Sequence, residues 1–524
     1  MAMLPELQEA HAAVSEIIPS LADVRRRYAS SWSDTDKAEH DRVQAEADRR
    51  FAAFQETLKR IEEATGLPPE FFEELAETEL PGDRTDRRAR SMLTVEEVEP
   101  TGCIDDHLPS ALDALVRRLP PGWLEEESPD LFRLPAAAVD RPVSIVKGFR
   151  PESERPGGHR LRQMVQVARD FLAGNSCYDH FAGATLVPQL ARLGTRLSIL
   201  DRVPGAAERV ANLWKKPAEV DNTVYELLVA AALAIAGRAP SFIPEGQGRT
   251  PDIRCVDPFP MVVECKRRDA LSVYELEEEA AMRLLFARLR REALARGACG
   301  VFDLKLTVEG SAIGIEEVVA RCVQQRLAPD PAKPLNYAWG SVAFRRRPER
   351  LRLPAPTKAY SPKLLKYVFG WDEDVPRHDG LICQADCIEG AMVEEVVRGV
   401  AMRWTNRAEA VADKRSRPPT SLFGKATGQM PGGEFGIVYI CYPEGAREEI
   451  ADRRVERLAE RLKEWEHSAA FRIPLVYIDR IYPRALDAGQ PDIIESTVSY
   501  LSEPAGGDPW MLEQFPGCVF TDTD

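Results

Sequence analysis

Several features that define common protein classes are missing from this sequence of 524 residues. Residues 1–6 lack the basic segment of a signal peptide, and the longest apolar run, 227–236, is too short to span a bilayer. The ten cysteines do not have the spacing of a disulfide framework, and the seven histidines form no catalytic or zinc-binding pattern. We therefore expect a cytoplasmic protein with reduced cysteines and no membrane partner.

The sequence also lacks a phosphate-binding glycine loop. Residues 424–427 resemble part of one but have no upstream glycine and no preceding strand, so no ATPase motor is expected. The formal net charge of -15 excludes a protein that coats nucleic acid over its whole surface. A local basic track remains compatible with this charge.

Length and periodicity predict an α/β protein of several domains. Residues 1–80 read as a helical or coiled-coil region, where we expect any homo-oligomer to form, and 81–216 as a mixed helical and linker region. A core at 217–328 and a C-terminal α/β region at 329–524 follow. Within the last region we predict strands at 339–346, 380–385, 435–442 and 472–480, and helices at 389–415 and 445–467.

The chemistry concentrates on a predicted β-hairpin. Taking 252–256 and 260–266 as antiparallel strands, side chains alternate between the two faces, which leaves an apolar face opposite a polar one. With Asp252 directly across from Glu264, the two carboxylates lie about 5 Å apart. Lys266, two residues beyond Glu264, shares their face.

Two carboxylates this close repel each other unless a cation lies between them. Mg²⁺ prefers carboxylate and water oxygens, and it can lower the pKa of a bound water that attacks a phosphodiester. A neighbouring lysine can orient or deprotonate that water. Asp252, Glu264 and Lys266 therefore predict metal-dependent phosphodiester hydrolysis, with Mg²⁺ or Mn²⁺ as the cofactor.

At these residues the chain resembles the PD-(D/E)XK nuclease superfamily, matching it at Pro251-Asp252 and at Glu264-Cys265-Lys266. The resemblance covers about 220–310 and implies a restriction-endonuclease-like mixed-sheet core. It implies that the backbone carbonyl of Cys265 is a further metal ligand, and that an acidic residue lies on the helix before the hairpin, where Glu226 stands. It also implies a helix after the hairpin, read at 272–297, and then a strand at 300–306.

Glu226 has a second interpretation. In the run from Thr223 to Glu226 the spacing is that of a capping box, in which the glutamate satisfies amides at a helix N-terminus and performs no chemistry. The residue is therefore either a ligand or a cap.

A basic segment at 345–366 is the candidate nucleic-acid track. Between Ala338 and Gly370 there are eight basic residues and one acidic residue, with aromatic residues interleaved. A solvated loop is the alternative interpretation. We predict phosphate contacts from the arginines on this segment and next to the hairpin, namely Arg267, Arg268, Arg345, Arg346, Arg347 and Arg350.

The sequence thus predicts a Mg²⁺- or Mn²⁺-dependent endonuclease that acts on DNA in preference to RNA, in antiviral defence or DNA processing. The alternative is a nucleic-acid-binding or scaffold protein built on the same core without turnover. A scaffold would be expected to have lost a metal ligand or the lysine, and Asp252, Glu264 and Lys266 are all present.

Overall fold

The computed structural model describes most of the chain after residue 90. It covers scattered positions between 38 and 60, then 94–98, 104–125, 143–147, 159–244 without 176 and 177, 250–268 without 258 and 259, 272–358, 361–370, 378–388, 392–430, 435–466, 473, 475–485, 491–501 and 515–520 without 518. The described positions between 38 and 60 are helical, as predicted, and the rest of the predicted region 1–80 lies outside the described residues.

The chain divides into two compact units, one made of 1–90 with 255–261 and the other of 91–254 with 262–524. Nearly all the described residues belong to the second unit, which is α/β with two mixed sheets. No helix in the described part of the chain is long and apolar enough to cross a membrane.

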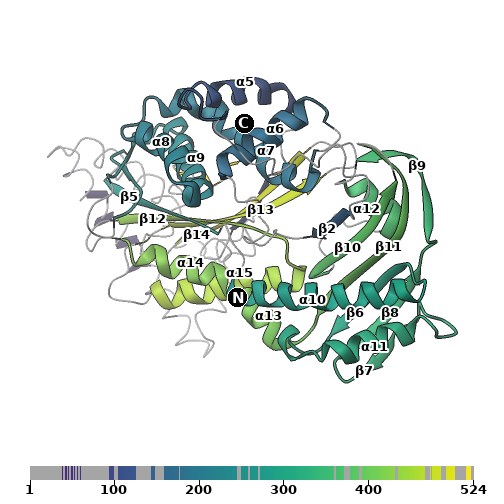
Figure 1. Ribbon diagram of the computed structural model, residues 1–524. Coiled ribbons are helices and arrows are strands. Elements are labelled where there is room, and N and C mark those ends of the chain that lie inside the picture. The colour runs from purple at the N-terminus through teal and green to yellow at the C-terminus, as the bar shows by residue number, and fades with distance from the viewer. Residues whose placement is uncertain are drawn as a thin grey trace, which may run out of the picture. The chain divides into compact units, whose positions relative to one another are not determined.

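The first sheet, as far as it is described, has seven strands in the order β1, β14, β13, β12, β5, β4, β3. Strands β5, β12, β13 and β14 of this sheet are labelled in Figure 1. Their bounds are β1 Thr94–Val98, β3 Pro240–Phe242, β4 Ile253–Cys255, β5 Met261–Arg267, β12 Phe435–Pro443, β13 Leu475–Ala485 and β14 Pro491–Leu501. β12 and β13 are parallel and are connected through helix α15 (Glu448–Glu466), whereas β14 pairs antiparallel with both β13 and β1. The sheet is therefore mixed.

Helices cover both faces of the first sheet. On one face α14 (Pro418–Thr427) and α15 pack in a core with alternate residues of β12, β13 and β14. On the other face α7 (His180–Leu200) packs against β13 and β14 (Figure 1). The remaining helices of this layer are α5 (Ile104–Val116), α6 (Arg160–Leu172), α8 (Ala206–Lys215) and α9 (Val220–Ile235), the last preceded by a 3-10 turn at Pro217–Glu219.

The second sheet pairs β2, β10, β11, β6, β8 and β7 in that order, with β9 added against β11. Their bounds are β2 Val143–Lys147, β6 Gly300–Leu306, β7 Leu335–Tyr337, β8 Gly340–Arg346, β9 Arg350–Lys358, β10 Gly380–Ile388 and β11 Met392–Asn406. Helices α10 (Val273–Ala295) and α11 (Ile315–Gln325) cover one face, and α12 (Pro362–Phe369) covers part of the other. A 3-10 turn, Gly310–Ala312, precedes α11.

The strand predicted at 300–306 forms as β6, but it belongs to the second sheet. In the first sheet β5 lies between β4 and β12, and β12 comes from much later in the chain. Val262 lies beside Gly436, and the Arg268 amide donates to the Cys441 carbonyl at 2.9 Å, so β5 and β12 run in the same direction. Strands β6 to β11 therefore lie, in sequence, between two parallel neighbours of the first sheet.

The prediction of a helix at 389–415 was wrong for most of its length. Met392–Asn406 forms the long strand β11, and only Glu409–Ser416 is helical, as α13. Register irregularities where β11 pairs with β9 and β10, and the positive φ of Arg398, disturb the simple alternation of a strand. The buried residues Val393, Val396 and Val400 are consequently spaced by three and four, which imitates a helix.

The basic segment is not a solvated loop, so that interpretation was wrong. Arg345 and Arg346 lie on β8, Arg350 lies on β9, and the lysines near 363–366 lie on α12. The segment is thus part of the second sheet and its covering helix.

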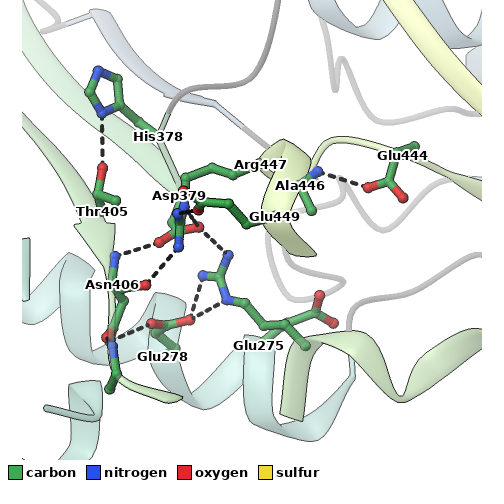
Figure 2. A network of polar contacts seen from close by, with 12 residues as sticks. Glu275, Glu278, His378, Asp379, Thr405, Asn406, Glu444, Ala446, Arg447 and Glu449 are labelled. Atoms are coloured by element: carbon green, nitrogen blue, oxygen red, sulfur yellow. Dashed lines mark hydrogen bonds and ion pairs between the residues drawn. The ribbon is translucent and has the colours of Figure 1, made fainter. Parts of the chain in front are cut away.

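A buried ion-pair network lies where both sheets and several helices meet (Figure 2). Asp379, just before β10, is 3.0 Å from both Arg415 and Arg447, and Arg415 also binds Glu278 of α10. The network continues through Arg454 of α15 to Glu444 and Glu275, and Glu275 also pairs with Arg268, the residue after β5. Four arginines thus face four carboxylates, so that each buried charge has an opposite charge beside it.

His180 should give the free energy of unfolding a pH dependence. Burial at the start of α7, and secondarily the charge of Lys358, lowers its pKa to about 4. A histidine in the unfolded chain has a pKa of about 6.5. The folded state therefore favours the neutral ring, so the contribution of His180 to the free energy of unfolding should be fully present above about pH 6.5 and be lost as the pH drops toward 4.

Urea denaturation at about pH 7.5 and about pH 5 checks this expectation. Relative to the wild-type protein, His180→Gln should raise the free energy of unfolding at about pH 5 compared with that at about pH 7.5, whereas His107→Gln, at an exposed position of α5, should not. The same pH dependence in both variants would contradict it.

Candidate active site

The predicted hairpin forms, but its register differs from the predicted one. The Asp252 amide donates to the Val263 carbonyl at 3.2 Å, so Asp252 lies beside Val263 and not directly across from Glu264. Its carboxylate Oδ2 accepts from the Cys265 amide at 2.8 Å. Asp252 is the residue before β4, and its carboxylate is held against the backbone of β5 at Cys265. The carboxylate therefore lies at the open end of the hairpin, away from the connection between its two strands.

Glu264 is fully buried on β5 and has two different oxygen environments. Its Oε1 accepts a hydrogen bond from Lys266 Nζ, and the same Nζ donates to the Cys265 carbonyl at 3.3 Å. Its Oε2 has no hydrogen-bond partner among the described residues. A buried carboxylate oxygen without a donor is costly, so this atom marks a place where a cation or a proton would be stabilising.

Glu226 reaches the same place from α9. This helix is apolar around most of its circumference and is buried almost throughout, which brings its one glutamate into the interior. The helix begins at Val220, so Thr223 lies inside it and cannot be its N-cap. The capping-box interpretation of Glu226 was therefore wrong.

Arg209 of α8 is the residue of this site that sequence reasoning missed. Its Nη1 lies 3.3 Å from Glu226 Oε2, and its guanidinium lies over the Phe242 ring at 5.6 Å. Nothing in the local sequence distinguishes it from the other arginines of the helical region. Only the packing of α8 against α9 brings it to the site.

Burial and a neighbouring carboxylate raise the pKa of two glutamates of the site. Burial raises the pKa of Glu264 to about 8 and that of Glu226 to about 8, and the charge of Asp252 adds to both shifts. Burial lowers the pKa of Lys266, but the charges of Glu264 and Asp252 outweigh this effect and its pKa is raised overall. At this site the three carboxyl groups of Glu226, Asp252 and Glu264 face the two cations Lys266 and Arg209.

The structure therefore brings together the predicted residues Glu226, Asp252, Glu264 and Lys266. In the described part of the chain, however, no three His, Cys, Asp or Glu side chains are grouped in the way that would hold a metal ion. Glu226 faces Arg209, so the donor set that remains for a cation consists of Asp252, Glu264 and the Cys265 carbonyl. Two carboxylates and a carbonyl, completed by water, suit Mg²⁺ or Mn²⁺.

Two of the arginines predicted to contact phosphate, Arg267 and Arg268, point into the protein. Arg267 is buried, with Nη1 3.2 Å from the Asp221 carbonyl and Nη2 3.1 Å from Gln189 Oε1, and Arg268 is paired with Glu275. Their guanidinium groups are used inside the protein, so both are withdrawn from the set of phosphate contacts.

The arginines of the basic segment lie on the second sheet, apart from the hairpin. Arg345 pairs with Asp303 at 3.1 Å, and Arg347 is half-buried against Gly370 at the end of α12. Arg346 and Arg350 are exposed, although Arg350 pairs with Glu395 at 2.9 Å. These two, with the exposed Arg352, are the ones that remain accessible to a partner.

Comparisons of this chain with protein-family models, with curated proteins and with solved structures found no match.

Removing one charge from the site should stabilise the protein. Asp252→Asn keeps an oxygen that can accept from the Cys265 amide but removes the charge that raises the pKa of both glutamates. We expect a gain of about 1 kcal/mol in metal-free buffer, or about 2–4 °C in melting temperature.

Asp303→Asn is the matched control, because Asp303 pairs with Arg345 and Arg403 and its loss should destabilise. Melting temperatures of both variants are measured in chelator. If Asp252→Asn lowered the melting temperature as much as Asp303→Asn does, the inferred excess of carboxylates at the site would be contradicted.

Proposed function

We propose that this protein is a divalent-metal-dependent nuclease whose site is formed by Asp252, Glu264, Lys266 and Glu226. The observation that carries the proposal is the excess of buried carboxyl groups over cations, together with the Glu264 oxygen that lacks a donor among the described residues. A structural cluster would be expected to balance its charges, as the network around Asp379 does. An excess of carboxylates is instead typical of a cation site.

Each residue has a role that follows from its chemistry. Asp252 and Glu264, with the Cys265 carbonyl, would hold Mg²⁺ or Mn²⁺, which when bound polarises the scissile phosphate and lowers the pKa of a water. Lys266 holds Glu264 on one side and would orient the attacking water or neutralise charge on the phosphate. Glu226 would assist as an outer ligand, with Arg209 limiting its negative charge.

The architecture around the site is compatible with a restriction-endonuclease-like core, which stays part of the proposal. α9 would supply the acidic residue before the hairpin, β4 and β5 the motif, and β12 the parallel neighbour that completes the sheet. The second sheet would select or grip the substrate. DNA is the favoured substrate, and cytoplasmic antiviral defence or DNA processing is the setting that we expect from the sequence.

The deciding assay incubates the purified protein with duplex DNA, single-stranded DNA and RNA, each with Mg²⁺, Mn²⁺ or chelator. Cleavage in metal and none in chelator supports the proposal. Mn²⁺ binding by calorimetry that Asp252→Ala abolishes, without cleavage of any of the three substrates, would instead favour a binding protein.

Lys266→Gln should abolish most cleavage while leaving the fold intact. The lysine cannot ligate a cation while it is charged, so its loss removes water orientation and charge stabilisation, at a cost of about 100-fold or more in kcat. Lys305→Gln is the matched control, because Lys305 is an exposed strand lysine on β6. Single-turnover cleavage that is normal in Lys266→Gln would overturn the assigned role.

The exposed arginines of the second sheet should set the salt dependence of DNA binding. Replacing Arg346, Arg350 and Arg352 by Gln removes three cations that lie on β8 and β9. The slope of log affinity against log salt should flatten by about one unit per lost phosphate contact.

Arg288 and Arg291, exposed on α10, serve as a control pair in the same titrations. If replacing them by Gln flattened the slope and the triple variant did not, the binding track would lie on α10 instead.

A further inference from the structure

A segment from the end of the chain, Phe515 to Phe520, is bound to the first sheet through its backbone. The Tyr477 hydroxyl donates to the Phe515 carbonyl at 2.6 Å, and the Tyr439 hydroxyl donates to the Pro516 carbonyl at 2.9 Å. Both tyrosines project from the sheet, and their rings stack with centroids 5.0 Å apart.

The last described residues of the segment, Val519 and Phe520, are held more closely still. Their amides donate to the two oxygens of Glu495, at 2.8 and 2.9 Å, and their carbonyls accept from Arg196 and Arg192 of α7, at 2.6 and 2.7 Å. Four charge-assisted hydrogen bonds therefore fix this dipeptide.

The Phe520 side chain is thereby placed between α9 and β5. Its ring stacks on Tyr225 with centroids 5.9 Å apart, and the Arg267 guanidinium lies 5.9 Å from its centroid. Tyr225 is held at its other end, where its hydroxyl donates to Asp479 at 2.5 Å. Phe520 thus contacts Tyr225 and Arg267, which are the sequence neighbours of the site residues Glu226 and Lys266.

Arg267 makes a second connection between the same two elements. Its side chain binds the Asp221 carbonyl and Gln189, and its amide donates to Asn222 Oδ1 at 3.2 Å. Asp221 and Asn222 lie in the first turn of α9, one turn before Glu226. The first half of α9 is therefore attached to the end of β5 along one side.

We propose that Phe520 is a positioning residue for the candidate active site: clamped by Glu495, Arg192 and Arg196, it fixes α9 against β5 and so sets Glu226 beside Asp252 and Glu264. The catalytic consequence rests on the proposed nuclease function, whereas the placement of α9 does not. A displacement of about 1 Å at a catalytic group can cost up to about 100-fold in rate. Loosening this contact should therefore reduce kcat more than it changes KM.

The test compares Phe520→Leu with Phe515→Leu. Both phenylalanines are buried in the same segment, so each variant removes a similar volume, but Phe520 is the one that contacts Tyr225 and Arg267. Amide hydrogen exchange over 220–235 is measured first, without metal or substrate. We expect exchange in the first half of α9 to be at least 10-fold faster in Phe520→Leu than in Phe515→Leu at matched stability.

Cleavage kinetics in Mg²⁺ follow, with kcat expected to fall about 10- to 100-fold in Phe520→Leu at unchanged KM. Unchanged exchange in α9 overturns the positioning role, and faster exchange with normal kcat overturns its catalytic consequence. If the wild-type protein cleaves no substrate, the proposed function fails, while the exchange result still decides the placement of α9. If Phe520→Leu does not fold, Glu495→Gln, which weakens the clamp on the Val519 and Phe520 amides, replaces it in both measurements.

Discussion

The pairing of buried arginines with buried carboxylates is the interaction on which the rest of the structure depends. Around Asp379, arginines and carboxylates from α10, α13, α15 and the ends of strands in both sheets are matched one to one, and the pairs hold these elements together. At the hairpin the same condition is not met, because three carboxylates share two cations and Glu264 Oε2 is left without a donor in the described part of the chain. This contrast within one molecule is the observation on which the proposed cation site rests.

β5 connects the two regions. Its residues Glu264 and Lys266 belong to the candidate site, Arg267 attaches it to α9, and Arg268 enters the buried network through Glu275. Residues near the end of β5, and the residue that follows it, therefore contact the candidate site, the helix that supplies Glu226, and the buried ion-pair network.

Local sequence patterns predicted the elements well where one physical signal dominated. The hairpin, the helix at 273–295, the strand at 300–306 and the last long helix form close to their predicted bounds. β11 was mistaken for a helix because its irregular pairing gives its valines helical spacing. Thr223 was mistaken for a possible cap because the three-residue turn before α9 moves the helix start upstream.

The sequence by itself determined that Asp252, Glu264 and Lys266 lie on one hairpin, since strand alternation and a short connection leave the chain little choice. It also determined that α9 is buried, because that helix is apolar on nearly every side. Only the tertiary structure decided which cation accompanies Glu226, that Arg267 and Arg268 face inward, and that Phe520 lies between α9 and β5. These contacts join residues tens to hundreds of positions apart, and they are selected by packing and by the pairing of buried charge, neither of which leaves a periodic signal in the chain.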